Sequence, residues 1–237
     1  MLYSLYRFDS KLRNLLIAII EYIEIEFRTK IAYTLAINYG AEGYRDADNF
    51  NDKISSYHNI KLHSLFCDRL ENEINKQSRR PLVKHHLENH DGRFPIWVAV
   101  EIISFGTLST LYSAMVDSDQ RTVSKSYNTN PDYMRSWFAA FVELRNTCAH
   151  YGRIYNTPFS SAPKLPKEYI KHKSNKLFPH ILAICYVLKG NSVLRDFLTT
   201  LKALLGEFDK VNLSFLGFPK NWERIVDEVS RPTGIIM

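Results

Sequence analysis

Residues 130–150 carry the strongest helical signal in the chain, and they read Asn-Pro-Asp-Tyr-Met-Arg-Ser-Trp-Phe-Ala-Ala-Phe-Val-Glu-Leu-Arg-Asn-Thr-Cys-Ala-His. Their large apolar residues recur at the spacing of one helical face, which predicts that this face is buried. The face consists of Trp137, Phe141, Leu144 and Cys148. Asn130 and Pro131 are typical of the start of a helix, and Gly152 is typical of its end.

Polar residues of the same helix lie away from that face. At about 100° per residue, Glu143, Asn146 and His150 fall on nearly one line. Arg145 lies roughly 140° round from His150 by the same count, so only its long side chain could bring the two groups together. The pattern predicts guanidinium, imidazole and carboxamide groups at one helix end.

Such a group of side chains suits the cleavage of phosphodiester bonds in RNA. An imidazole titrates near neutral pH and can take or give a proton, and a guanidinium offers several donors to a phosphate. The spacing Arg-x4-His is weak by itself. The alternative is that His150 caps helix carbonyls and that Arg145 pairs with Glu143.

Four ordered stretches together are more specific. Arg145-Asn-Thr-Cys-Ala-His150 resembles the Arg-Asn-x-x-x-His signature of HEPN-domain proteins in their abortive-infection (Abi, AbiD/AbiF-like) form. Three upstream stretches resemble the same family in order and spacing: Leu5-Tyr-Arg-Phe-Asp-Ser-Lys-Leu-Arg13, Ile23-Glu-Ile-Glu-Phe-Arg28-Thr-Lys-Ile-Ala-Tyr33 and Pro95-Ile-Trp-Val-Ala-Val-Glu101-Ile-Ile-Ser-Phe-Gly-Thr-Leu-Ser109. Relatives usually carry a further segment upstream, so we expect a short form here.

The resemblance implies an all-α fold, frequent dimerisation and, in many relatives, metal-independent ribonuclease activity. It implies that Arg145 and His150 are catalytic, with Asn146 in support. Further candidates for supporting this site are Glu143, Glu101, Arg28 and Glu24. Glu24 and Arg28, four residues apart, form either a surface ion pair or a second layer behind this site. Some HEPN proteins bind RNA without cutting it.

Composition agrees with a globular protein that has a substantial core. The chain has 237 residues, 45% of them hydrophobic, and a net charge of +6, which favours polyanions only mildly. Its three cysteines are far apart and odd in number, which fits a reducing cytoplasm better than a disulfide framework or a zinc site. The apolar run at residues 15–20 is too short to span a bilayer.

The pattern of apolar residues predicts helices at residues 10–39, 53–77, 96–116, 176–189, 193–210 and 221–229, with a helix or loop at 117–127. Gly106 is expected to be tolerated or to kink the third of them. Glu101 lies in that apolar helix, so its carboxylate is expected to need a partner such as Arg28 or Arg145. Residues 40–52 and 157–167 are predicted connections, and 232–237 a loose tail.

Two basic segments are candidate RNA-binding surfaces, although solvated loops are the alternative for both. The candidates are Arg79, Arg80, Lys84, Arg153, Lys164, Lys167, Lys171, Lys173 and Lys176. His86 and His90 are spaced for a metal on a helix, but no third ligand has matching spacing, so no metal or other cofactor is predicted.

The sequence therefore predicts an all-α, HEPN-type helical bundle at residues 1–156, with a basic connection and C-terminal helices at 157–237 packed on it. The predicted function is a metal-independent endoribonuclease of abortive-infection or toxin type in anti-phage defence, cutting RNA at a site shared by a homodimer. One alternative is a non-catalytic RNA-binding protein that holds a small RNA and acts as a sensor. Another is a purely structural helical dimer.

Overall fold

The computed structural model describes residues 2–208 and 211–231, and the fold there is all-α, as predicted. Within those ranges the only β structure is two isolated bridges. The α-helices are α1 (Leu2–Tyr39), α2 (Leu62–Lys76), α3 (Pro81–Asn89), α4 (Ile96–Ile102), α5 (Phe105–Ala114), α6 (Asp117–Lys125), α7 (Pro131–Ala149), α8 (Leu177–Val187), α9 (Ser192–Glu207) and α10 (Trp222–Ser230). Short 3-10 turns are η1 (Gly43–Arg45), η2 (Ala47–Asn49), η3 (Lys167–His172) and η4 (Leu213–Leu216).

The chain divides into two compact units. Unit 1 comprises Met1–Ile23 and Asp132–Met237, and unit 2 comprises Glu24–Pro131. The division expected at residue 156 falls inside unit 1 and stays a prediction. None of the described helices combines the length and the apolar character that a membrane span needs.

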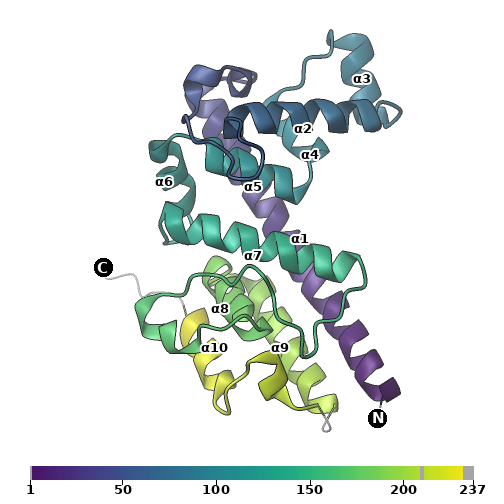
Figure 1. Ribbon diagram of the computed structural model, residues 1–237, viewed down its shortest axis with the longest axis vertical. Coiled ribbons are helices and arrows are strands. Elements are labelled where there is room, and N and C mark those ends of the chain that lie inside the picture. Colours follow the sequence, from purple (N-terminus) through teal and green to yellow (C-terminus); the bar gives the residue numbers. More distant parts are fainter. Residues whose placement is uncertain (1, 209–210, 232–237) are drawn as a thin grey trace. The chain divides into compact units, whose positions relative to one another are not determined.

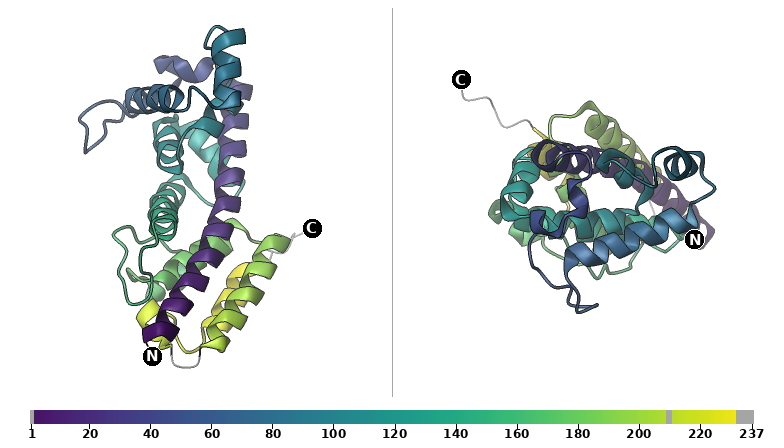
Figure 2. Two further views of the ribbon diagram at one scale, coloured as in Figure 1. Left: turned by 90° about the vertical axis from the view of Figure 1, so that its right-hand side faces the viewer. Right: turned by 90° about the horizontal axis from the view of Figure 1, so that it is seen from above.

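In unit 1, the N-terminal part of α1 runs beside α9 (Figures 1 and 2), and two contacts join them. Lys11 pairs with Glu207, and the Asn191 amide donates to the Tyr22 hydroxyl at 2.9 Å. α8 is buried on nearly all sides and packs against α10. The predicted apolar face of α7 is buried throughout, which confirms the periodicity argument.

In unit 2, α2 packs against α5 and α4. Buried polar contacts fix the loops: the Tyr44 hydroxyl donates to the Phe94 carbonyl at 2.7 Å, and Asn38 and Tyr39 donate to the Asp119 carboxylate. The predicted end of α1 at Gly40 is confirmed, since this glycine takes a left-handed φ of 79°.

Three predicted boundaries were wrong. α1 begins at Leu2 rather than at residue 10, and α2 begins at Leu62 rather than at residue 53. Residues 53–61 form a turn closed by an isolated bridge between Ile54 and Lys61, and just before them the Asn51 amide donates to the carbonyls of Ser113 and Met115. The predicted helix 96–116 is two helices, broken at Ile103, and Ser104 then caps α5 by accepting from the Thr107 N–H.

The remaining helix predictions are confirmed within two or three residues, for α6 to α10. Residues 40–52 and 157–167 are connections, as predicted, apart from the short 3-10 turns η1 and η2 and the first residue of η3. The predicted tail at 232–237 lies outside the described residues.

Candidate functional site

The candidate catalytic residues lie at the C-terminal end of α7. Arg145 and Asn146 belong to its last turns, and His150 lies in the turn that follows, with its backbone N–H bonded to the Asn146 carbonyl at 3.0 Å. Asn146 and His150 are exposed and Arg145 is half-buried. The backbone of this helix end therefore presents all three side chains from one short segment.

None of these three side chains forms a hydrogen bond or an ion pair with another residue of the described chain. The alternative in which Arg145 pairs with Glu143 is therefore wrong for this structure. The three groups share a helix end, and no hydrogen bond joins Arg145 to His150. That these two side chains converge on one phosphate stays a prediction.

Glu143 was expected to support the site, and its carboxylate is used elsewhere. Its two oxygens accept the backbone N–H groups of Ser160 at 2.7 Å and Ser161 at 2.5 Å. The residue thus fastens the proline- and serine-rich connection to α7. Beside this connection, His180 is fully buried, and burial lowers its pKa to about 4.

The end of α7 is built by an unusual pair of residues. The Gly152 N–H reaches back to the Thr147 carbonyl at 2.8 Å and the Tyr151 N–H to the Cys148 carbonyl at 3.2 Å. Tyr151 itself takes the left-handed φ of 58° that glycine usually takes at a helix end. A Cβ at Gly152 would lie 2.9 Å from the Thr147 methyl carbon, so any other residue there would force Thr147 to shift.

A buried ion pair on α1 holds the segment that follows this helix end, and the sequence analysis missed its role. Asp9 and Arg13 bond at 2.5 Å. The Asp9 carboxylate also accepts the N–H groups of Ile154 at 3.1 Å and Tyr155 at 2.8 Å. Both acidic and basic members lie in the quoted stretch Leu5–Arg13, but nothing in their spacing points to a partner some 140 residues away.

The residues expected to support the motif from elsewhere lie in unit 2, whereas the motif lies in unit 1. Glu24 and Arg28 form an ion pair, and Arg28 also donates to the Ile103 carbonyl at 2.8 Å. The pair is largely buried, so the alternative of a surface ion pair was wrong. Glu101 is exposed, so the expectation that its carboxylate is buried and needs a partner was wrong. Any link between these residues and the motif stays a prediction.

Most of the predicted RNA-binding residues are exposed. Those in unit 1 are Arg153, Lys164, Lys167, Lys171 and Lys173, and those in unit 2 are Arg79, Arg80 and Lys84. Lys176 is half-buried and donates to the Asn156 side chain at 3.4 Å. His86 is buried and bonded to the Arg93 carbonyl at 2.9 Å, so it does not belong to a solvated basic patch. In the part of the chain that the structure describes, no cluster of three metal-binding side chains occurs.

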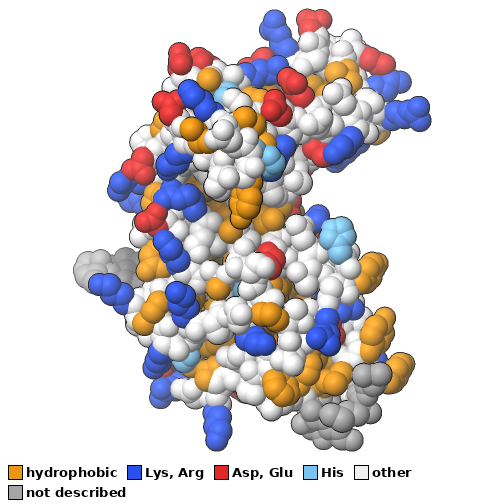
Figure 3. Space-filling model, in the orientation of Figure 1, with side chains coloured by type: hydrophobic (Ala, Val, Ile, Leu, Met, Phe, Trp, Pro, Cys, Tyr) orange, Lys and Arg blue, Asp and Glu red, His pale blue; other side chains and the backbone are white. Residues whose placement is uncertain are grey.

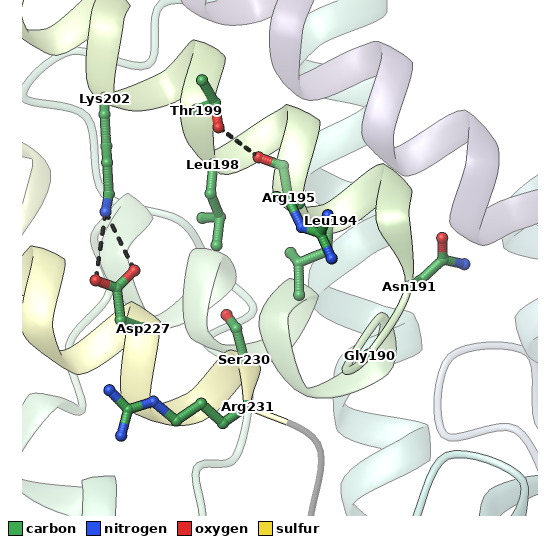
Figure 4. Close-up of a pocket in the computed structure, with 10 residues that line it drawn as sticks. All are labelled: Gly190, Asn191, Leu194, Arg195, Leu198, Thr199, Lys202, Asp227, Ser230 and Arg231. Atoms are coloured by element: carbon green, nitrogen blue, oxygen red, sulfur yellow. Dashed lines mark hydrogen bonds and ion pairs between the residues drawn. The ribbon is translucent and has the colours of Figure 1, made fainter.

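Unit 1 contains a cavity of about 640 Å³ at the N-terminal turns of α1. Its other wall consists of Tyr151, Arg153 and Tyr155, which follow His150 in the sequence. A second cavity, of about 400 Å³, lies between α9 and α10 (Figure 4), where Lys202 reaches toward Asp227 at 3.1 Å. The second cavity contains none of the predicted site residues.

Cysteine chemistry does not suit this site. Cys148 lies on α7 close to the motif, but burial raises the pKa of its thiol to about 12. Because the thiolate is the nucleophile, this side chain is almost entirely unreactive near neutral pH. The imidazole of His150, by contrast, is exposed at the helix end.

Comparison with known proteins gives one result. The model of the family described as Abi-like protein matches residues 1–156, which is well over half of the chain. No curated protein and no solved structure matches the chain significantly. The matched region includes the Asp9–Arg13 pair, the motif helix and the turn after it. The chain belongs to the Abi-like protein family.

Proposed function

We propose that this protein is a metal-independent endoribonuclease of the abortive-infection or toxin type, built on a HEPN-type helical domain. His150 exchanges a proton with the 2′-hydroxyl or the leaving oxygen, Arg145 holds the scissile phosphate, and Asn146 supports them. The family supports a role in abortive infection. The nuclease chemistry rests on the motif itself.

One observation carries the proposal: three polar side chains at one helix end form no hydrogen bond or ion pair with the described residues. Elsewhere in unit 1 the charged groups near the motif are engaged, Asp9 and Arg13 with the following segment and Glu143 with the connection. Arg145, Asn146 and His150 have no such bonds to the described residues and remain available to a ligand. Groups available in this way are expected of a site that binds and reacts.

The chemistry needs more than one histidine. In the cleavage step the 2′-oxygen attacks the phosphorus and loses its proton, while the 5′-oxygen leaves and gains one, so that a 2′,3′-cyclic phosphate remains. One imidazole cannot readily serve both oxygens, which lie on opposite sides of the phosphorus. We therefore propose a homodimer in which two motifs face one RNA strand, with one His150 as base and its counterpart as acid.

The test is cleavage of end-labelled RNA in excess EDTA by the wild-type protein and by His150→Ala. We expect cutting to survive EDTA and to fall by roughly a hundredfold or more in the variant, as for loss of an acid–base group. His58→Ala is the matched control, because His58 is also exposed but lies in unit 2. Cutting that persists in His150→Ala, or that EDTA abolishes, would contradict the proposal.

The exposed lysines favour a second candidate, an RNA-binding protein that holds a small RNA without cutting it. None of Lys164, Lys167, Lys171 and Lys173 forms an ion pair with a described residue, so their charge is available to phosphates. If the wild type and His150→Ala bind RNA equally and neither cuts, this candidate replaces the first. Neutralising the four lysines should then weaken binding and reduce its dependence on salt.

A further inference from the structure

The cavity between the start of α1 and the segment after His150 has an unusual lining. Four tyrosines surround it, Tyr3 and Tyr6 from the first turns of α1 and Tyr151 and Tyr155 from the segment after α7, together with Arg153. Hydrophobic side chains project at this end of α1 in Figure 3. The exposed fractions are 74% for Tyr3, 67% for Tyr6 and 84% for Tyr151, so three rings stand open to a ligand.

The cavity is also firmly built. Tyr155 packs edge-on against Phe8 and Phe215, with ring centres 6.0 and 5.7 Å away, and its backbone N–H is held by Asp9 at 2.8 Å. Tyr155 therefore forms a fixed wall. The open rings of Tyr3 and Tyr6 lie on the regular turns of α1, which positions them without a loop.

Tyr151 gives the second, independent observation. A non-glycine residue with a left-handed φ is sterically costly, and such outliers gather at functional sites. Glycine would satisfy the helix end better at this position, yet the chain places glycine only at the next one, where space demands it. The side chain at 151 is exposed and packs against no described ring, so its packing does not repay that cost.

We propose that this cavity binds an unpaired nucleobase of single-stranded RNA, stacked among the rings of Tyr3, Tyr6 and Tyr151, with the exposed Arg153 on a neighbouring phosphate. Aromatic rings beside a cation are what single-stranded nucleic acid sites use, because every base has a face that stacks. Tyr151 directly follows His150, so a base held here would place the adjoining phosphate near the motif. The inference rests on the proposed function in that it takes RNA as the ligand.

The experiment uses the full chain carrying His150→Ala and a short single-stranded RNA in which one adenine is replaced by 2-aminopurine, whose fluorescence is quenched by stacking. We expect quenching on binding, and affinity roughly 5- to 100-fold weaker in Tyr6→Ala or Tyr151→Gly. Tyr6→Phe, which keeps the ring, should bind as before. Tyr57→Ala is the matched control, since Tyr57 is 94% exposed but lies in unit 2.

Tyr151→Gly separates a binding role from a structural one. Because glycine suits the left-handed conformation, this variant should unfold at the same or a higher temperature while losing affinity for the probe. Loss of affinity together with lower stability would overturn the inference, as would unchanged affinity and quenching in both tyrosine variants. A lower molecular mass of either tyrosine variant in solution, compared with the parent protein, would also overturn it. The rings would then form an interface between copies of the chain.

The two proposals can fail separately. Cutting of RNA by the wild-type protein with probe affinity unaffected by the tyrosines would leave the nuclease intact and remove the base site. Tyrosine-dependent quenching without any cutting of RNA would keep the base site and remove the nuclease. Absence of both probe binding and RNA cutting would overturn both.

Discussion

α1 carries two ion pairs of the same design, one in each unit. In both, an acid is followed four residues later by an arginine that also donates to a backbone carbonyl: Arg13 to Gly152 at 3.4 Å and Arg28 to Ile103 at 2.8 Å. Each arginine thus ties α1 to a point where another helix has just ended.

The two pairs differ in how completely their groups are used. Asp9 and Arg13 are 7% and 8% exposed, and Asp9 accepts two backbone N–H groups in addition to its partner. Glu24 and Arg28 are 13% and 12% exposed, and the Arg28 Nη1 atom is buried without a hydrogen bond to any described residue. A buried pair contributes to stability only when its remaining donors and acceptors are satisfied. We therefore expect the Asp9–Arg13 pair to contribute more to the free energy of unfolding than the Glu24–Arg28 pair.

The largest effect is expected for Asp9→Ala. This change leaves the Arg13 charge buried and removes the acceptor for two N–H groups, so the free energy of unfolding should fall by about 3–5 kcal/mol. Urea unfolding measures it. Lys11→Ala is the control on the same helix; its pair with Glu207 is roughly half exposed, so we expect a loss below about 1 kcal/mol. Equal losses in the two variants would refute the argument.

Acid should weaken unit 1 through a group that unit 2 lacks. His180 stays neutral in the folded protein until its lowered pKa of about 4, whereas in the unfolded chain it takes a proton near its ordinary pKa of 6.5. Its contribution is therefore fully present above pH 6.5 and is lost as pH falls toward 4, by about 3 kcal/mol over this range. Urea unfolding at several pH values measures the free energy of unfolding of the wild type and of His180→Phe. The wild type should lose more of it than the variant as the pH falls from 6.5 to 4. Equal losses would show that burial does not lower the pKa of His180.

The smallest effect is expected for Arg28→Met. Methionine keeps much of the side chain's bulk while removing the unsatisfied Nη1 donor, so the gain offsets part of the lost ion pair. We expect the free energy of unfolding to fall by about 1–2 kcal/mol. The fall should be larger for Arg13→Met, because Arg13 has no buried unsatisfied donor whose removal would offset the lost ion pair. If urea unfolding shows a larger fall in the free energy of unfolding for Arg28→Met than for Arg13→Met, the Glu24–Arg28 pair contributes more to stability and the expectation is wrong.

Local signals in the sequence predicted those elements whose ends are set locally. α7 begins at its proline, and α1 ends at a glycine with a left-handed φ. Long-range bonds decided the elements that were mispredicted. Asp9 looks like a poor residue for a helix interior, yet α1 continues through it because its carboxylate bonds to residues 154 and 155 instead of competing for its own helix.

The candidate site shows the same division. Arg145 and Asn146 lie on α7, as the spacing predicted, and His150 lies in the turn directly after that helix. The other use of Glu143 and the tyrosine-lined cavity could not be foreseen, because both depend on segments that are distant in sequence and meet only in the folded unit. Periodicity identifies a face but not what the face meets.

The burial of two of the three native thiols simplifies site-specific labelling of this chain. Cys148 and Cys185 are buried, which raises the pKa of each thiol to about 12 and keeps it protonated at neutral pH. Cys67 is only half-buried, so it would be replaced by serine first. A cysteine introduced at an exposed position such as Tyr57 or Tyr151 would react far faster with a maleimide. In the Cys67→Ser background, one such cysteine would attach a fluorophore or spin label next to the motif in sequence or far from it.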